Sequence, residues 1–331
     1  MTVASLEALP LELLSFVAEY LTAQETFALS MVNKNLFAGL QSKLYSTIDV
    51  QFDMETPNPL LQLLRTLLDK TWLGHHFFNI SLPGLGSFVD YIDAYVDTPA
   101  LPEASILPSE RLARLIGAIG VNEDHACAWF NAIQNPNADD MDAERRRDWH
   151  VQSIHLDTVL ALVVAISPNL VRLSIDTKWA TSSHYLGTLV RACASRKNHQ
   201  AEDSVVDEDS GFSGLRVTGS HRLREVDIVR GYDTIVEPPH TTDTLSWFYL
   251  PAIEHLFISI DNEDNFTWPL SATPQPLSLT SLGLDRLREP RLSSFLGPLV
   301  SLKRLTYNWF CQEDIRHCNT TADLSQLAAS I

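Results

Sequence analysis

Apolar residues recur at two different spacings along this chain, and each spacing predicts a different kind of element. Between residues 9 and 45 they recur three or four positions apart in three consecutive series, which predicts three short helices. Pro10 suits the first turn of the first helix, where a missing N–H costs nothing. Thr22 and Glu25 have the spacing of a capping box, so a second helix is expected to begin after Thr22. From residue 46 onward, strand-like and helix-like segments alternate.

The three predicted helices contain more apolar side chains than so short a segment can cover. The second helix is expected to turn Phe27, Ala28 and Leu29 inward. A segment of about 40 residues cannot build a large core by itself. We therefore expect another surface, either from this chain or from a partner, to cover part of the apolar residues.

A Leu-x-x-Leu-x-Leu pattern recurs five times in the second half of the chain. Its apolar positions are Leu170-Leu173-Ile175, Leu223-Val226-Ile228, Ile253-Leu256-Ile258, Leu279-Leu282-Leu284 and Leu302-Leu305-Tyr307. The first positions lie 53, 30, 26 and 23 residues apart, and the last three intervals are close to the period of about 20–29 residues found in leucine-rich repeats. The longest interval contains residues 198–214, an acidic stretch that is expected to be a flexible insertion.

Each unit is expected to be a helix, a turn marked by Pro or Gly, and a strand, and neighbouring units would stack into a curved parallel sheet with helices on the convex side. Because side chains alternate along a strand, the positions between the apolar ones would face the open, concave side. These candidate substrate-binding residues are Arg172, Asp176, Glu225, Asp227, His255, Phe257, Asp285, Arg304 and Asn308. Two alternatives remain open: a solvated sheet surface that binds nothing, and unrelated strands of a generic α/β domain.

Composition narrows the choice of partners and compartment. The 24 Lys and Arg residues against 41 Asp and Glu residues give a net charge of −17, which disfavours nucleic acid and membrane surfaces as partners. The four cysteines are scattered and form no disulfide framework, which indicates a reducing compartment. The sequence shows no signal peptide and no membrane-spanning run, so a cytoplasmic or nuclear protein is expected.

Catalytic and metal-binding signatures are missing from the sequence. It contains no phosphate-binding Gly-rich loop, no Gly-x-Ser-x-Gly and no His-Glu-x-x-His. Cys311, His317 and Cys318 are too few and too loosely spaced for a structural zinc site. We expect no catalytic residues, no metal and no cofactor, although a hydrolase or transferase with divergent residues remains a third alternative.

The first 45 residues resemble an F-box. The resemblance rests on Leu9-Pro10-x-Glu12-Leu13-Leu14, Tyr20-Leu21 and Leu29-x-x-Val32-x-Lys34. It departs from the family pattern at Asn33, where a cysteine is frequent, and at Leu36 or Phe37, where a tryptophan is common. The resemblance implies a three-helix segment that binds a Skp-type adaptor and through it a cullin-RING ubiquitin ligase. The implied adaptor contacts are Leu9, Pro10, Leu13, Val17, Leu21, Leu29, Val32, Leu36 and Phe37.

Together the two parts resemble a fungal-type F-box protein with divergent leucine-rich repeats. The expected fold class is α/β, with an F-box at residues 1–45 and a repeat domain at residues 46–331. The implied function is substrate recognition in a Skp-cullin-F-box E3 ubiquitin ligase, with no catalysis by the chain itself. The alternative is a leucine-rich-repeat interaction scaffold without a ligase role, in which the N-terminal helices only cap the repeats.

Overall fold

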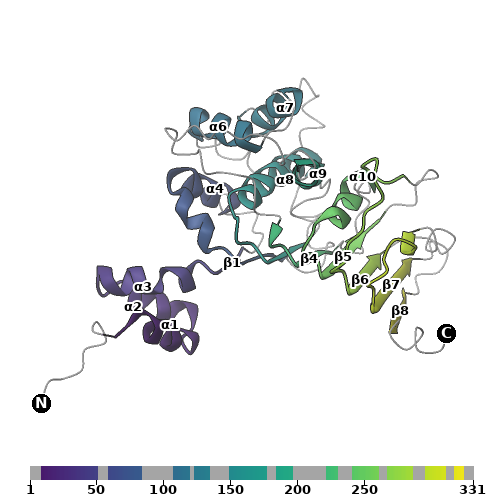
Figure 1. Ribbon diagram of the computed structural model, residues 1–331. Coiled ribbons are helices and arrows are strands. Elements are labelled where there is room, and N and C mark those ends of the chain that lie inside the picture. The colour runs from purple at the N-terminus through teal and green to yellow at the C-terminus, as the bar shows by residue number, and fades with distance from the viewer. Residues whose placement is uncertain are drawn as a thin grey trace, which may run out of the picture.

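The structure of the 331-residue chain is a computed structural model, and it has a helical N-terminal part followed by a sheet with helices on one face (Figure 1). It describes residues 9–50, 59–83, 107–119, 123–134, 149–176, 184–196, 221–229, 241–260, 267–285, 295–310 and 317–323. The acidic stretch at 198–214 and Cys311 lie outside the described residues. The N-terminal part consists of α1 (Leu11–Glu19), α2 (Ala23–Ser30) and α3 (Lys34–Leu44). Three helices were predicted in this region.

The strands form one sheet in which spatial order follows chain order. The strands are β1 (Thr47–Asp49), β2 (Asn79–Leu82), β3 (Arg172–Asp176), β4 (Glu225–Val229), β5 (His255–Ser259), β6 (Ser281–Asp285), β7 (Arg304–Phe310) and β8 (His317–Asp323). The first seven strands pair in parallel, and β8 pairs antiparallel with β7. This arrangement confirms the α/β class with a parallel sheet and is compatible with a solenoid; β8 was not predicted.

One backbone contact recurs at the entrance of each parallel strand from β2 to β7. A single carbonyl oxygen of the preceding strand segment accepts hydrogen bonds from two consecutive N–H groups, at 2.8–3.1 Å. The accepting carbonyls belong to Ser46, Phe78, Val171, Arg224, Glu254 and Thr280. Each accepting residue after Ser46 also donates its own N–H to the preceding carbonyl of the series. The contacts are therefore linked, and together they fix the register from one strand to the next.

This register aligns the apolar positions of successive strands into rows beneath the helices. The first row is Ile48, Ile80, Leu173, Val226, Leu256, Leu282 and Leu305. All members of this row except Ile48 are buried, and Ile48 packs against the same core. The middle apolar positions of the five predicted repeats therefore occupy equivalent, buried positions on successive strands.

The strands at the start of the sheet form two further units. Alternating apolar residues at 46–52 and 78–82 predict strands there, but these segments were not counted among the five repeats. Around β1, the apolar positions of a repeat are occupied by Tyr45, Ile48 and Val50. Around β2, two of these positions are occupied by Phe77 and Ile80. The departure from leucine at the first position hid these units. Between β2 and β3, the chain also passes through two additional helices, which lengthens the interval far beyond a repeat period.

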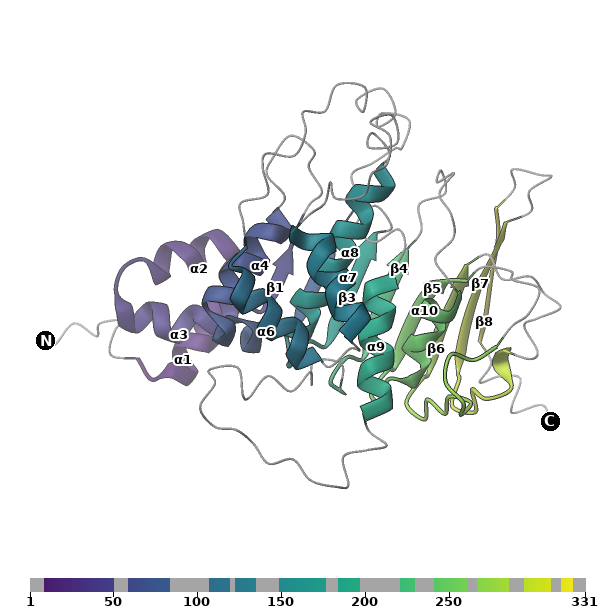
Figure 2. The ribbon, with the colours of Figure 1, turned by 90° about the horizontal axis from the view of Figure 1, so that it is seen from above.

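The described helices that follow β1 lie on one face of the sheet (Figures 1 and 2). They are α4 (Pro59–Asp69), α6 (Ser109–Ile119), α7 (Glu123–Gln134), α8 (Trp149–Ala165), α9 (His184–Arg196) and α10 (Thr241–Leu245), with short 3₁₀ segments at Thr71–His76 and Ser246–Tyr249. Residues 159–166, which include the C-terminal part of α8 and the residue after it, are all buried. A helix that is apolar all round belongs in the interior, and α8 packs against both α4 and α9.

The N-terminal helices have a small core of their own. It consists of Leu14, Ala18, Leu36 and Leu40, with Leu29 packed against it, and it is separate from the main core under the sheet. The link to the following part includes a hydrogen-bonding contact of 2.9 Å between Gln41 Nε2 and His76 Nε2. The three helices therefore form a distinct unit, which we call the N-terminal module (residues 9–44).

Replacing a buried strand residue should destabilise the sheet strongly. Leu282→Ala removes a side chain that is 1% exposed, and we expect the free energy of unfolding to fall by about 2–5 kcal/mol. Val300→Ala is the control, because Val300 is 81% exposed and should change stability by about 0.5 kcal/mol or less. Urea denaturation measures both. Equal stability of the two variants would contradict the helix-covered core.

Removing the N-terminal module should leave the rest of the chain folded. A variant that lacks residues 1–44 keeps Tyr45 and Ile48, which pack against the main core. We expect it to retain a cooperative thermal transition and a near-UV circular dichroism spectrum, because the main core is complete without the module. Loss of the transition would show that the module acts as a cap of the sheet.

Candidate partner-binding surfaces

Polar side chains fix the ends of the helices in the N-terminal module. Glu25 N–H donates to Thr22 Oγ1 at 3.3 Å, and Thr22 N–H donates to Glu25 Oε2 at 2.8 Å, so the predicted capping box is confirmed. These bonds to the Thr22 backbone and side chain hold the pKa of Glu25 below its usual range. Asn33 caps α3 by accepting a hydrogen bond from Leu36 N–H at 2.8 Å. The residue that departs from the F-box pattern therefore has a structural role here.

Large apolar side chains are exposed mainly on the N-terminal module. Of twelve exposed large hydrophobic residues within the described parts of the chain, eight belong to this module. They are Leu11, Leu13, Phe16, Tyr20, Phe27, Met31, Val32 and Phe37, which we call the apolar surface of the module. Monomeric proteins rarely concentrate exposed apolar side chains in this way, and such a concentration marks an interaction site.

Helical spacing places several members of the apolar surface side by side. Leu13 and Phe16 on α1 and Tyr20 at its C-cap lie three or four positions apart, on the side away from the buried Leu14 and Ala18. The rings of Phe16 and Tyr20 meet edge to face with centroids 5.3 Å apart. The module therefore turns one side of α1 inward and presents an aromatic and aliphatic side outward.

The predicted adaptor contacts divide into three groups by burial. Pro10, Leu13, Val32 and Phe37 are exposed, and Leu9, Val17, Leu21 and Leu29 are half-buried. Leu36 is only 2% exposed and belongs to the core of the module, so in the free chain its side chain is covered by the module itself. Phe27 was expected to point inward and is 58% exposed, because Thr26 and Ser30 occupy the inner side of α2 instead. The sequence prediction also omitted Leu11, Phe16, Tyr20, Phe27 and Met31 from the contact set.

The second candidate surface is the face of the sheet opposite the helices, which we call the open face. Two rows of its side chains follow from the strand register. The first row contains Asn79, Arg172, Glu225, His255, Ser281 and Arg304, and the second contains Ser81, Ser174, Asp227, Phe257, Gly283 and Thr306. The structure thus brings six predicted binding residues onto neighbouring strands of one face.

Two ion pairs link neighbouring strand positions at the entrance of the sheet. Arg172 Nε lies 3.4 Å from Glu225 Oε2, and Arg224 Nη1 lies 3.4 Å from Glu254 Oε1. All four side chains are at least 40% exposed. Such exposed pairs contribute at most about 1 kcal/mol each to stability.

Asp227 differs from these paired groups. It is half-buried in the second row, and no described residue donates a hydrogen bond to its buried Oδ1. Burial raises the pKa of Asp227, and the nearby charge of Arg172 only partly opposes this effect. The ionised form of Asp227 is therefore less favourable at this position than it would be in water.

Phe257 is held in place by a glycine on the next strand. A Cβ atom added to Gly283 would lie 2.0 Å from Phe257 Cδ2, so the ring rests on the backbone of β6. The ring remains half-buried and lies in register with Asp227 on β4. Its predicted position on the open face agrees with this register.

The remaining predicted residues of the open face have different surroundings. His255 and Arg304 are exposed, and Asp176 is half-buried at the end of β3. Asp285 is only 7% exposed and accepts a hydrogen bond from Ser259 Oγ at 3.4 Å, so little of its side chain is accessible in the free chain. Asn308 pairs in register with Asp285, and its side chain lies outside the described part.

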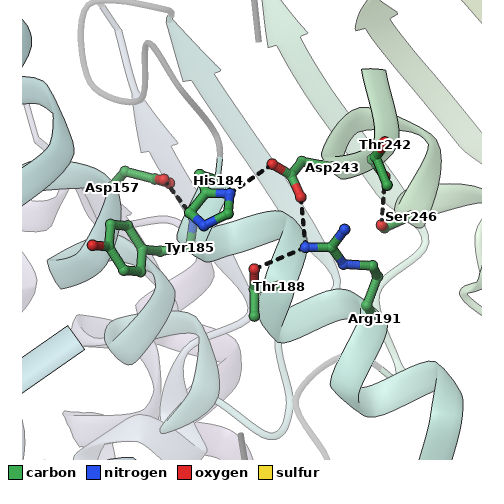
Figure 3. A network of polar contacts seen from close by, with 8 residues as sticks. All are labelled: Asp157, His184, Tyr185, Thr188, Arg191, Thr242, Asp243 and Ser246. Carbon is green, nitrogen blue, oxygen red and sulfur yellow. Dashed lines mark hydrogen bonds and ion pairs between the residues drawn. The ribbon is translucent and has the colours of Figure 1, made fainter. Parts of the chain in front are cut away.

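A polar network joins three helices on the covered face of the sheet (Figure 3). His184 Nδ1 lies 2.9 Å from Asp243 Oδ2, and Arg191 Nη2 lies 2.8 Å from Asp243 Oδ1. Asp157 on α8 accepts a hydrogen bond from Tyr185 N–H at 2.8 Å, at the beginning of α9. The hydrogen bond to Asp243 raises the pKa of His184, although burial opposes it.

This network holds helices together. Gly187 allows α9 and α10 to approach closely, since an added Cβ would lie 2.7 Å from Asp243 Cα. Asp243 is 2% exposed, and its charge is balanced by Arg191 and, when the imidazole is protonated, by His184. The sequence interpretation overlooked this network; the available signal was Asp157, a charged residue at the start of an apolar run.

No protein-family model matches the sequence, and no curated protein matches it. None of the helices that the structure describes is both long enough and apolar enough to cross a lipid bilayer. Among the described residues, no three His, Cys, Asp or Glu side chains are grouped so that they could hold a metal ion.

The contribution of His184 to stability should depend on pH. Its folded-state pKa is raised above the unfolded value near 6.5, so protonated His184 stabilises the fold fully below that value and loses this effect as pH rises through the folded pKa. We expect His184→Gln to lower the melting temperature below about pH 6.5 and to differ less from wild type at higher pH. His255→Gln, on an exposed strand position, is the matched control. A pH-independent difference between the His184 variant and wild type would contradict the ion pair.

Proposed function

We propose that this chain is the substrate-recognition subunit of a Skp-cullin-F-box E3 ubiquitin ligase. In this proposal the N-terminal module binds a Skp-type adaptor, and the open face of the sheet binds a protein substrate. The chain positions the substrate and performs no bond chemistry. The free thiol of Cys127 fits a reducing compartment, and we propose that the complex acts in the cytoplasm or nucleus.

The observation that supports adaptor binding most strongly is the apolar surface of the module. Leu13 is 51% exposed, Phe16 55% and Val32 64%. A surface position that contacts only solvent has no need of an apolar side chain. When a partner covers such side chains, the complex is stabilised by about 25 cal/mol for each Å² of apolar area that is buried. Aromatic and aliphatic residues that become fully covered supply most of the binding energy in protein interfaces.

The separate core of the module favours an independent docking unit over a simple cap. A cap would share its core with the sheet, whereas Leu14, Ala18, Leu36 and Leu40 form a cluster apart from the main core. The unit therefore fits a role in which it binds one protein while the sheet binds another. An interaction scaffold without a ligase role would share the open face and would lack adaptor binding.

Adaptor binding is tested with purified proteins. We expect the wild-type chain to bind a purified Skp-type adaptor, and we expect Leu13→Ala and Val32→Ala to weaken this binding by about 2 kcal/mol each, or roughly 30-fold in Kd, because both side chains would be covered at the interface. Isothermal titration calorimetry measures the change.

Leu277→Ala is the matched control, since Leu277 is a leucine that is 71% exposed outside the module. It should bind the adaptor as tightly as wild type does. The proposal fails if the wild-type chain does not bind the adaptor, or if the module variants and the control bind equally well.

A further inference from the structure

We propose that Asp227 and Phe257 together receive a lysine or arginine side chain of the protein segment that binds the open face. The inference deepens the proposed recruiting role of that face and depends on it. It does not depend on adaptor binding by the N-terminal module. The two residues lie in register on neighbouring strands near the middle of the sheet.

One oxygen of the Asp227 carboxylate, Oδ1, is buried and has no hydrogen-bond donor among the described residues. Arg172, whose charge acts on Asp227 from a distance, makes its ion pair with Glu225, and Arg224 pairs with Glu254. Buried polar groups in native proteins are nearly always hydrogen-bonded, and an exception calls for a reason.

Burial of Asp227 outweighs the favourable charge of Arg172, which is the cationic group that partly opposes the rise of its pKa. Burial disfavours the ionised form, so the carboxylate reduces the stability of the free chain at neutral pH. Residues that lower the stability of the fold are typical of functional sites. A cationic group supplied by a partner would offset this cost, and the offset would appear as binding energy.

Phe257 supplies the second half of the site. Its ring rests on Gly283 of β6, which lies on the far side of β5 from Asp227. The ring is thus fixed in the same row of the open face as the carboxylate, and it does not supply the missing donor. Lys and Arg pack their methylene stems along apolar surfaces while the charged head reaches a polar partner, and aromatic rings also attract the head directly.

The overall charge of the chain favours the same class of partner. A net charge of −17 attracts basic segments over a long range, and a fixed carboxylate beside an aromatic ring then selects the position of one cationic side chain. Paired acids such as Glu225 and Glu254 are already engaged within the sheet. Asp227 is therefore the position where this attraction becomes specific.

A peptide library tests the proposal. The probes are nonapeptides whose central residue is Lys, Arg, norleucine or Glu, with randomised uncharged flanks, applied to the immobilised full chain and measured by mass spectrometry. We expect wild type to retain the Lys and Arg peptides about tenfold more than the norleucine peptides, as a charge-assisted contact predicts. Asp227→Asn should abolish this preference, and Phe257→Leu should reduce it.

Asp49→Asn is the matched control, because Asp49 is an exposed aspartate in the same row at β1. It should keep the preference of wild type. The proposal is overturned if wild type shows no preference, if Asp227→Asn retains it, or if Asp49→Asn loses it equally, since equal loss would indicate attraction by the total charge alone.

A stability measurement separates binding from folding. Asp227→Asn keeps the shape of the side chain and removes its charge, so its melting temperature at pH 7 should equal or exceed that of wild type. A lower melting temperature would show that the carboxylate has a structural partner and would overturn the proposal. Adaptor binding by this variant should be unchanged, so failure of the ligase proposal and failure of this inference give different results.

Discussion

The alignment of parallel strands by a shared carbonyl is the constraint on which the rest of the structure depends. Each accepting oxygen, from Ser46 to Thr280, bonds two consecutive N–H groups of the next strand and so fixes its register. A slip of one residue would exchange the two faces of every strand. Because the register holds across seven strands, apolar rows meet the helices and polar rows form one continuous open face.

The two candidate surfaces differ in chemistry and in position along the chain. The N-terminal module exposes aliphatic and aromatic side chains around Leu13 and Phe16, whereas the open face contains charged groups around Arg172 and Asp227. Apolar interfaces are typical of permanent complexes. More polar interfaces are typical of partners that bind and dissociate. This division matches a protein that brings a substrate to a permanent assembly, which is the function we propose.

The strongly periodic parts of the fold were predictable from the sequence, and the parts that depend on tertiary packing were not. Five strands followed from repeated apolar positions such as Leu256 and Leu282, which are buried as expected. The strand at 78–82 was also predicted, but it was not counted as a repeat, because three described helices, α6, α7 and α8, separate β2 from β3. The burial of Leu36 beside the exposed Phe37 depends on how α3 packs against α1, and the Asp243 network joins helices distant in sequence. Apolar spacing alone determines neither.

Hydrogen–deuterium exchange of the full chain, measured with and without a purified Skp-type adaptor, tests the central claim most directly. The claim is that the chain has two separate binding surfaces, the first of which is apolar and lies on residues 9–44. We expect the adaptor to slow exchange in peptides from α1 to α3 and to leave peptides from β3 to β6 unchanged. Unchanged exchange throughout the module, or protection that appears on the sheet instead, would contradict the account.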